Sequence, residues 1–281
     1  MIRRRTLGLA AGAALLLNLV GCAAPPRVKT HTALPGVEVL PAALAMPGLD
    51  RQRQLRIYLP PGYAQSSERY PVLYMHDAQN LFDDFTSFVG EWGVDETLDE
   101  LARSHGLKLI VVGIDNGGDK RMTELNPWDH PKFGKGEGAA YTRFIVEVVK
   151  PHIDRQYRTR PGREHTAMMG SSMGGLISHY AIQQYPQVFS KAGIFSPSYW
   201  AAPALREAAQ RPLPMDTRLY LYMGGREGGE MNTDVRQVVA ALSGRALPVE
   251  QIRFSAQASA EHNEAAWRTE FGPALLWLFK P

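Results

Sequence analysis

Hydrophobic and polar positions along the chain follow the two periods expected of strands and helices. Residues 54–59 alternate between polar and apolar, which predicts a strand with one buried face. Residues 72–75 and 109–114 are apolar runs, which are typical of strands covered on both faces of a sheet. Stretches with helical period lie between such runs, so strands and helices are expected to alternate.

Four further strands and five helices complete this pattern. We expect the strands at residues 37–40, 192–195, 219–223 and 251–254, and the helices at 91–104, 139–149 (closed by Pro151), 176–185, 234–242 and 264–279. This order predicts the α/β class, with a mostly parallel sheet covered by helices on both faces. Ligands then bind beyond the carboxyl ends of the strands, within one domain over residues 37–281.

The N-terminus has the features of a targeting segment. Three arginines at residues 3–5 precede an apolar stretch, residues 7–20, that is too short to span a bilayer. It ends in Leu19-Val20-Gly21-Cys22, which resembles a bacterial lipobox. The resemblance implies a signal peptide over residues 1–21, a lipid on Cys22 that attaches the chain to a membrane, and a tether over residues 22–36. An ordinary signal peptide with an incidental cysteine is the alternative.

The residue that follows Cys22 also predicts where the chain is located. Ala23 follows the cysteine, and by resemblance to Gram-negative sorting rules this favours the periplasmic side of the outer membrane. The chain is therefore expected to be exported and lipid-anchored in the bacterial cell envelope. Arg4-Arg5 also faintly resembles a twin-arginine signal, which leaves the export route open.

Composition and charge argue against a disulfide-stabilised protein and against a nucleic-acid-binding protein. Cys22 is the only cysteine, so no disulfide can form within the chain. Residues 1–21 hold three arginines and no acidic residue, and without them the formal charge falls from +3 to zero. We therefore expect no nucleic-acid partner. No clustered ligand spacing such as H-E-x-x-H occurs, so we expect neither a metal nor an organic cofactor.

A G-x-S-x-G motif at residues 170–174 places Ser172 between an apolar run and a predicted helix. Strand, sharp turn and helix are the context in which this motif presents a nucleophilic serine. The chain holds 26 glycines, so the motif alone is weak evidence. An acid and a histidine that follow in this order would strengthen it.

Both partners are present downstream of the serine. Glu227 follows the strand predicted at residues 219–223, with Glu230 close behind as the alternative acid. His262 lies in the loop between the last predicted strand and the last helix. In this arrangement the histidine takes the serine proton, the carboxylate orients the histidine, and backbone N–H groups stabilise the oxyanion. One N–H is expected from Met173, the other from the loop after residues 72–75.

Several longer stretches resemble the “putative esterase” family of α/β-hydrolases. They are residues 58–63, 70–83, 170–175, 195–200 and 261–267, within a resemblance over about 37–280. The resemblance implies the α/β-hydrolase fold and supports Ser172, Glu227 and His262 as the catalytic triad. It also suggests the N–H of Gln79 as the second oxyanion donor, with Ala78 as the alternative.

The expected function is a serine carboxylic-ester hydrolase that acts on a siderophore ester or on a feruloyl or acetyl carbohydrate ester. Candidates to line its pocket are Trp92, Arg121, Trp128 and Trp200, each of which could instead serve packing. The alternatives are an acyltransferase of the cell envelope and a non-catalytic binding protein on a hydrolase scaffold. The sequence leaves the substrate and the oligomeric state open.

Overall fold

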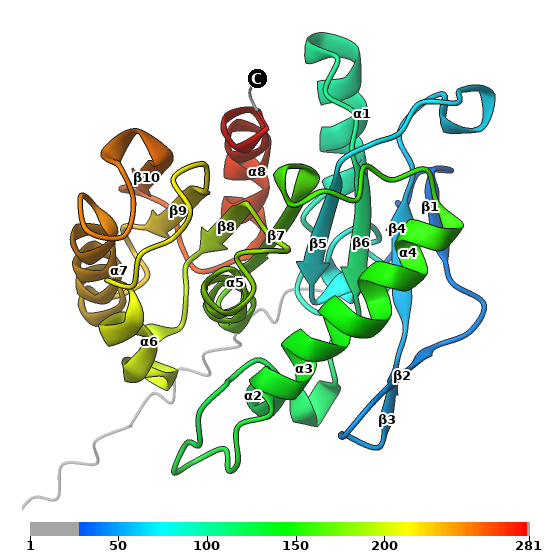
Figure 1. Cartoon of the computed structure of the whole chain (residues 1–281). Helices are drawn as coiled ribbons and strands as arrows, with labels where there is room; N and C mark the ends of the chain where they lie inside the picture. The colour runs from blue at the N-terminus through cyan, green and yellow to red at the C-terminus, as the bar shows by residue number, and fades with distance from the viewer. Residues whose placement is uncertain (1–27, 280–281) are drawn as a thin grey trace, which may run out of the picture.

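A computed structural model describes residues 28–279. Its main feature is an eight-stranded sheet (Figure 1). In sheet order the strands are β1 (Val37–Val39), β4 (Leu55–Tyr58), β6 (Ile110–Ile114), β5 (Val72–His76), β7 (Thr166–Ser171), β8 (Lys191–Phe195), β9 (Arg218–Gly224) and β10 (Ile252–Gln257). The strands from β6 to β10 are parallel, whereas β4 and β1 are antiparallel at one edge. The predicted mostly parallel sheet of an α/β fold is thus confirmed.

Helices cover both faces of the sheet. One face packs on α3 (Gly138–Phe144), α4 (Lys150–Gln156), α5 (Met173–Gln184) and α7 (Gly229–Leu242), and the other on α1 (Val94–His105) and α8 (Glu264–Leu278). Successive residues of β5 alternate between the two cores: Val72 and Tyr74 face one, and Leu73 and Met75 face the other. This double burial explains why the strand reads as a continuous apolar run.

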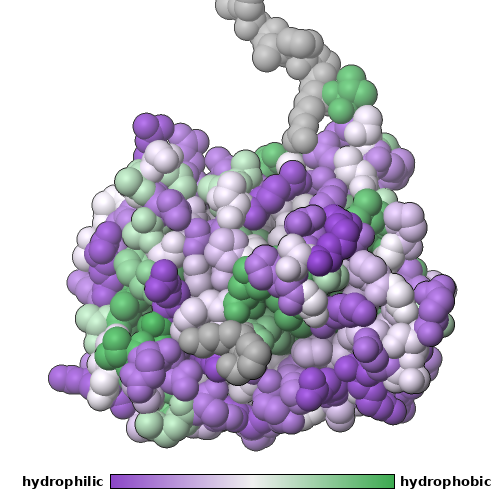
Figure 2. Space-filling model, turned by 90° about the horizontal axis from the view of Figure 1, so that it is seen from above, coloured by the Kyte–Doolittle hydropathy of each residue, from purple (hydrophilic) through white to green (hydrophobic). Residues whose placement is uncertain are grey.

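The surface at the amino ends of the parallel strands is mostly hydrophilic where the described residues are visible (Figure 2). Figure 2 looks onto this face, where hydrophilic residues predominate and hydrophobic ones form small, separate groups. Among residues 28–279, no helix has both the length and the hydropathy needed to cross a bilayer.

The helix expected at residues 139–149 continues beyond Pro151, which corrects the prediction. A π-helical turn, Ile145–Val149, connects α3 to α4, and Pro151 lies in the first turn of α4. Proline is tolerated there because its missing N–H falls where the hydrogen-bond pattern changes register. The same helix therefore runs on to Gln156.

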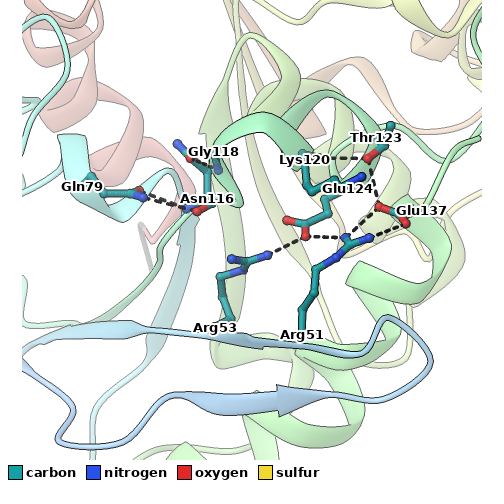
Figure 3. Close-up of polar contacts among 9 residues, drawn as sticks. All are labelled: Arg51, Arg53, Gln79, Asn116, Gly118, Lys120, Thr123, Glu124 and Glu137. Atoms are coloured by element: carbon teal, nitrogen blue, oxygen red, sulfur yellow. Dashed lines mark hydrogen bonds and ion pairs between the residues drawn. The ribbon is translucent and has the colours of Figure 1, made fainter. Parts of the chain in front are cut away.

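A hairpin of β2 (Leu44–Met46) and β3 (Arg51–Arg53) was not predicted, because its second strand is polar. Its arginines form ion pairs with distant carboxylates (Figure 3). Arg51 and Arg53 both bind Glu124 of the short helix α2 (Arg121–Glu124), and Arg51 also binds Glu137. The hairpin thereby holds α2 against the rest of the domain. A further short helix, α6 (Pro203–Ala208), was also not predicted.

The predicted signal peptide, residues 1–21, and Cys22 lie outside the described residues. The last part of the predicted tether is described, and it lies against the loop of residues 83–93 and the first turn of α1. The N–H of Thr32 donates to Asp83, and the N–H of Leu34 donates to Asp95 at 2.8 Å. Residues 31–34 are therefore packed on the domain.

Candidate active site

Ser172 occupies a sharp turn between β7 and α5. Its φ of 58° and ψ of −120° are unusual for a residue with a side chain. The turn is tight because β7, α5 and β8 approach one another closely. A Cβ on Gly170 would lie 2.8 Å from the Gly174 carbonyl carbon, and one on Gly175 would lie 2.6 Å from the Phe195 oxygen. The expected strand, turn and helix are present, with the serine at the apex.

Glu227 lies in the loop after β9, and its side chain is fully buried. Oε1 accepts hydrogen bonds from the Ser196 hydroxyl and the Gly224 N–H, each at 2.7 Å. Oε2 lies 2.7 Å from His262 Nδ1. Glu230, the alternative acid, is exposed in the first turn of α7. The structure therefore brings Glu227 to the histidine.

His262 lies in the loop between β10 and α8 and is about one-third exposed. Its ring contacts Trp267 edge to face at 5.0 Å between centroids. The indole N–H of Trp267 donates to Ser196 Oγ at 2.9 Å, so the tryptophan and the carboxylate share one serine. Because Nδ1 is engaged by Glu227, Nε2 is the nitrogen available to a second group.

Ser172 and His262 both line one pocket of about 780 Å³ at the carboxyl ends of the strands. Among the predicted residues, Gln79, Trp92 and Arg121 also line it. Trp92 forms part of its floor, since its ring packs on Phe195, Trp267 and Phe271. Within residues 28–279, no group of three or more His, Cys, Asp or Glu side chains is arranged to hold a metal.

Two of the predicted lining residues lie elsewhere, which corrects that expectation. Trp128 packs edge to face on Tyr180 of α5 at 5.6 Å. Trp200 contacts the His130 and Phe133 rings and is 39% exposed. Neither tryptophan lines the pocket around Ser172. For both, packing was the alternative interpretation of the sequence.

The two backbone N–H groups expected to bind an oxyanion lie in the first turn of a helical segment. Met173 is the first residue of α5, and Gln79 lies in a short 3₁₀ turn, Ala78–Asn80, directly after β5. Among the described residues, neither N–H has a hydrogen-bond acceptor in the protein. Free N–H groups at such turns are suited to bind negative charge.

A partly buried ion pair holds the turn that carries Gln79. Arg121 Nε and Nη2 donate to the two oxygens of Asp77 at 2.6 and 2.9 Å, and Asn116 Nδ2 also donates to Asp77. Burial opposes ionisation, but the Arg121 charge outweighs it and holds the pKa of Asp77 below its usual value. The Gln79 side chain exchanges two hydrogen bonds with the Asn116 backbone (Figure 3). These pairings between loops leave no pattern in the sequence that could predict them.

Two further polar side chains at the pocket were not predicted. Ser198 Oγ lies 3.1 Å from Ser172 Oγ, and its N–H donates to the Ser172 carbonyl. Glu264 is a buried lining residue that accepts a hydrogen bond from Asn80, and burial raises its pKa. Its place at the start of α8, two residues after His262, is the feature of the sequence that could have predicted Glu264 at the site.

A family model described as “Putative esterase” matches residues 47–278. The uncharacterized protein YbbA of Bacillus subtilis is 28% identical over 244 residues, which cover 81% of this chain and 92% of that protein. The ferri-bacillibactin esterase BesA of B. subtilis is 23% identical over 256 residues, which cover 80% and 84%. The crystal structure of the BES protein from Bacillus cereus has a similar fold, with a TM-score of 0.71 at 20% identity, over 90% of this chain and 98% of that one.

Proposed function

The chain belongs to this esterase family and is a carboxylic ester hydrolase, and we propose that Ser172, His262 and Glu227 carry out its reaction. The observation that carries the proposal is the 2.7 Å contact of His262 Nδ1 with Glu227 Oε2, beside a pocket lined by both His262 and Ser172. The buried Glu227 receives two other hydrogen bonds, which fix its orientation. A carboxylate held in this way selects the imidazole tautomer that has its basic nitrogen on Nε2.

In the proposed mechanism Ser172 Oγ attacks the ester carbonyl while His262 Nε2 takes its proton. The oxyanion is stabilised by the N–H groups of Met173 and Gln79. The tetrahedral intermediate collapses to an acyl-enzyme, and His262 returns the proton to the departing alcohol. Water then attacks the acyl-enzyme by the same steps in reverse, which releases the acid and restores Ser172.

We propose as the substrate an ester whose acid part carries an aromatic ring, either a catecholate siderophore ester or a feruloyl ester. The indole of Trp92 in the pocket floor suits an aromatic ring, and the Arg121 guanidinium suits a phenolate. The name of the similar B. subtilis ferri-bacillibactin esterase supports the siderophore ester. An acetylated carbohydrate uses neither of these features of the pocket.

We also propose that the chain is exported and held by a lipid on Cys22 at the periplasmic side of the outer membrane. The support is the sequence around Cys22, the only cysteine in the chain. Mass spectrometry of the protein from cell membranes tests this proposal. A mature chain that begins at an acylated Cys22 is the expected result, and an unmodified cysteine would contradict it.

The decisive experiment measures hydrolysis of p-nitrophenyl acetate, p-nitrophenyl butyrate, methyl ferulate and a catecholate trilactone by the full chain in detergent. Ser172→Ala and His262→Ala should abolish turnover, whereas Ser104→Ala, a change at an exposed helical serine, should retain it. We expect higher turnover of methyl ferulate or the catecholate trilactone than of the two p-nitrophenyl esters. Turnover that needs an added alcohol acceptor would indicate an acyltransferase. A folded chain that neither turns over nor is acylated would indicate a binding protein.

A further inference from the structure

Exposed hydrophobic side chains gather at the mouth of the pocket. Phe85, Phe88 and Val89 are 51%, 85% and 60% exposed and lie within five residues of one loop. Phe88 and Val89 line the mouth directly. The other large exposed hydrophobic residues in the described part of the chain are spread over several elements. We call Phe85, Phe88 and Val89 the apolar rim.

The N-terminal segment leaves the domain beside this rim. Lys29 Nζ donates to the carbonyl of Ser87, and Lys29 itself lines the pocket. The His31 ring stacks on Phe85, with 4.1 Å between centroids. Val28, the first described residue, is 83% exposed. The chain therefore enters the domain at the mouth of the pocket.

The length of chain before this point limits how the domain can turn toward a membrane. Lys29 is seven positions after Cys22, and an extended chain over seven positions spans at most about 25 Å. A compact domain of this size is roughly 45 Å across. A lipid on Cys22 therefore cannot reach a bilayer that lies against the opposite face, at the amino ends of the strands. The attachment therefore excludes orientations in which the mouth points directly away from the membrane.

We propose that the apolar rim inserts into the bilayer that holds the Cys22 lipid, so that the active site opens onto the membrane surface. The inference rests on the proposed lipid anchor but not on the proposed triad. An exposed phenylalanine and valine at an interface bury apolar surface among the acyl chains, about 5–10 Å deep. Asp83 beside the rim is covered by His31 and Thr32, which reduces the charge presented to the lipid.

Phe88→Cys in the full lipidated chain tests this insertion. A thiol-reactive, environment-sensitive dye labels position 88 alone when the sulfur of Cys22 carries its lipid. Val249→Cys and Met215→Cys are matched controls, since both side chains are about two-thirds exposed near the amino ends of β10 and β9. The labelled proteins are reconstituted into vesicles of phosphatidylethanolamine and phosphatidylglycerol.

A blue shift and a several-fold rise in emission are expected at position 88, with quenching by nitroxide-labelled lipid, and neither is expected at positions 249 and 215. Equal, water-like emission at all three positions would overturn the proposal. An unlipidated Cys22 would overturn it as well. Turnover of a dissolved ester, measured in parallel, reports on the triad alone, so its failure is separate from failure of the rim to insert.

Discussion

Ser196 holds Glu227 from the side opposite to His262. Its hydroxyl donates to Glu227 Oε1 at 2.7 Å and accepts from the Trp267 indole at 2.9 Å. Ser196 is fully buried and has a φ of 43°, which is rare for a residue other than glycine. A backbone held in this conformation is usually fixed by its surroundings. Here the N–H of Ser196 donates to the Tyr222 carbonyl of β9, the strand that precedes Glu227.

Ser196→Ala should lower kcat with little change in KM. The variant removes one hydrogen bond to a buried carboxylate, worth about 1.5–3 kcal/mol, which corresponds to about a 10- to 100-fold fall. Steady-state kinetics with p-nitrophenyl butyrate checks this. Tyr222→Phe is the control, because that buried hydroxyl has no partner among the described residues. An unchanged kcat would show that Gly224 alone orients Glu227.

Glu227→Gln should be far more damaging than Glu230→Gln. The amide keeps the shape of the side chain but can no longer accept from His262 and Ser196 with full charge, and in serine triads such a change costs about 10³- to 10⁴-fold in kcat. Glu230 is exposed, so its replacement should leave kcat unchanged. Both variants are compared in one assay with the unchanged chain. A larger loss for Glu230→Gln would reassign the acid.

Arg121→Met should reduce turnover even of a small neutral ester. Its bidentate pair with Asp77 holds the turn that carries the N–H of Gln79, and loss of an oxyanion donor costs about 10²- to 10³-fold. The check is kcat with p-nitrophenyl acetate, and Lys120→Met is the exposed neighbouring control. If Arg121 only binds a phenolate of the substrate, the variant will keep its activity on p-nitrophenyl acetate and lose it on the catecholate ester.

Gly175→Ala should destabilise the fold, because its Cβ would lie 2.6 Å from the backbone oxygen of Phe195. Such overpacking against rigid backbone costs about 1–3 kcal/mol or more. Gly229→Ala, at the start of α7, is the control, since no heavy atom beyond its chain neighbours would lie within 4 Å of its Cβ and the change should leave stability unchanged or raise it by up to about 1 kcal/mol. Urea unfolding followed by circular dichroism measures both. Equal midpoints would contradict this account of the turn.

Asp95→Asn should change how stability depends on pH. Burial raises the pKa of Asp95 to about 8, so the folded chain binds a proton that the unfolded chain releases near pH 4. The stability that this carboxyl contributes is complete below about pH 4 and is lost as the pH rises toward 8. The asparagine variant should lack that decline, as measured by urea midpoints across this range. Glu100→Gln, at an exposed site, should retain it.

Much of the sheet was predictable because its central strands are buried on both faces. The run at residues 109–114 became β6 with a difference of one residue, since both faces of this strand are buried. The hairpin strand Arg51–Arg53 has no such signal. Its arginines are neutralised by Glu124 and Glu137, more than seventy residues away, and local periodicity carries no information on such pairs.

The residues of the candidate site also divide into those that could be predicted from the sequence and those that could not. Ser172, Glu227 and His262 could be chosen because each follows a predicted strand in the order typical of the fold. The supporting residues Ser196 and Asp77 could not be chosen, because their roles depend on which loops meet in space. Residue type and position after a strand make Trp128 and Trp200 candidates to line the pocket. Type and position do not determine which way a side chain points, and both lie away from the pocket.

The docked segment at residues 31–34 also determines how the domain carries a mechanical load. In an experiment that pulls the chain by its N-terminus, the force enters at Lys29 and meets the hydrogen bonds of Thr32 and Leu34 to Asp83 and Asp95. These bonds share the force between the loop at the mouth and the first turn of α1. The edge strand β1 lies further along the chain, so the force reaches it only after these hydrogen bonds break. The segment therefore has to detach from the domain before the sheet bears the force.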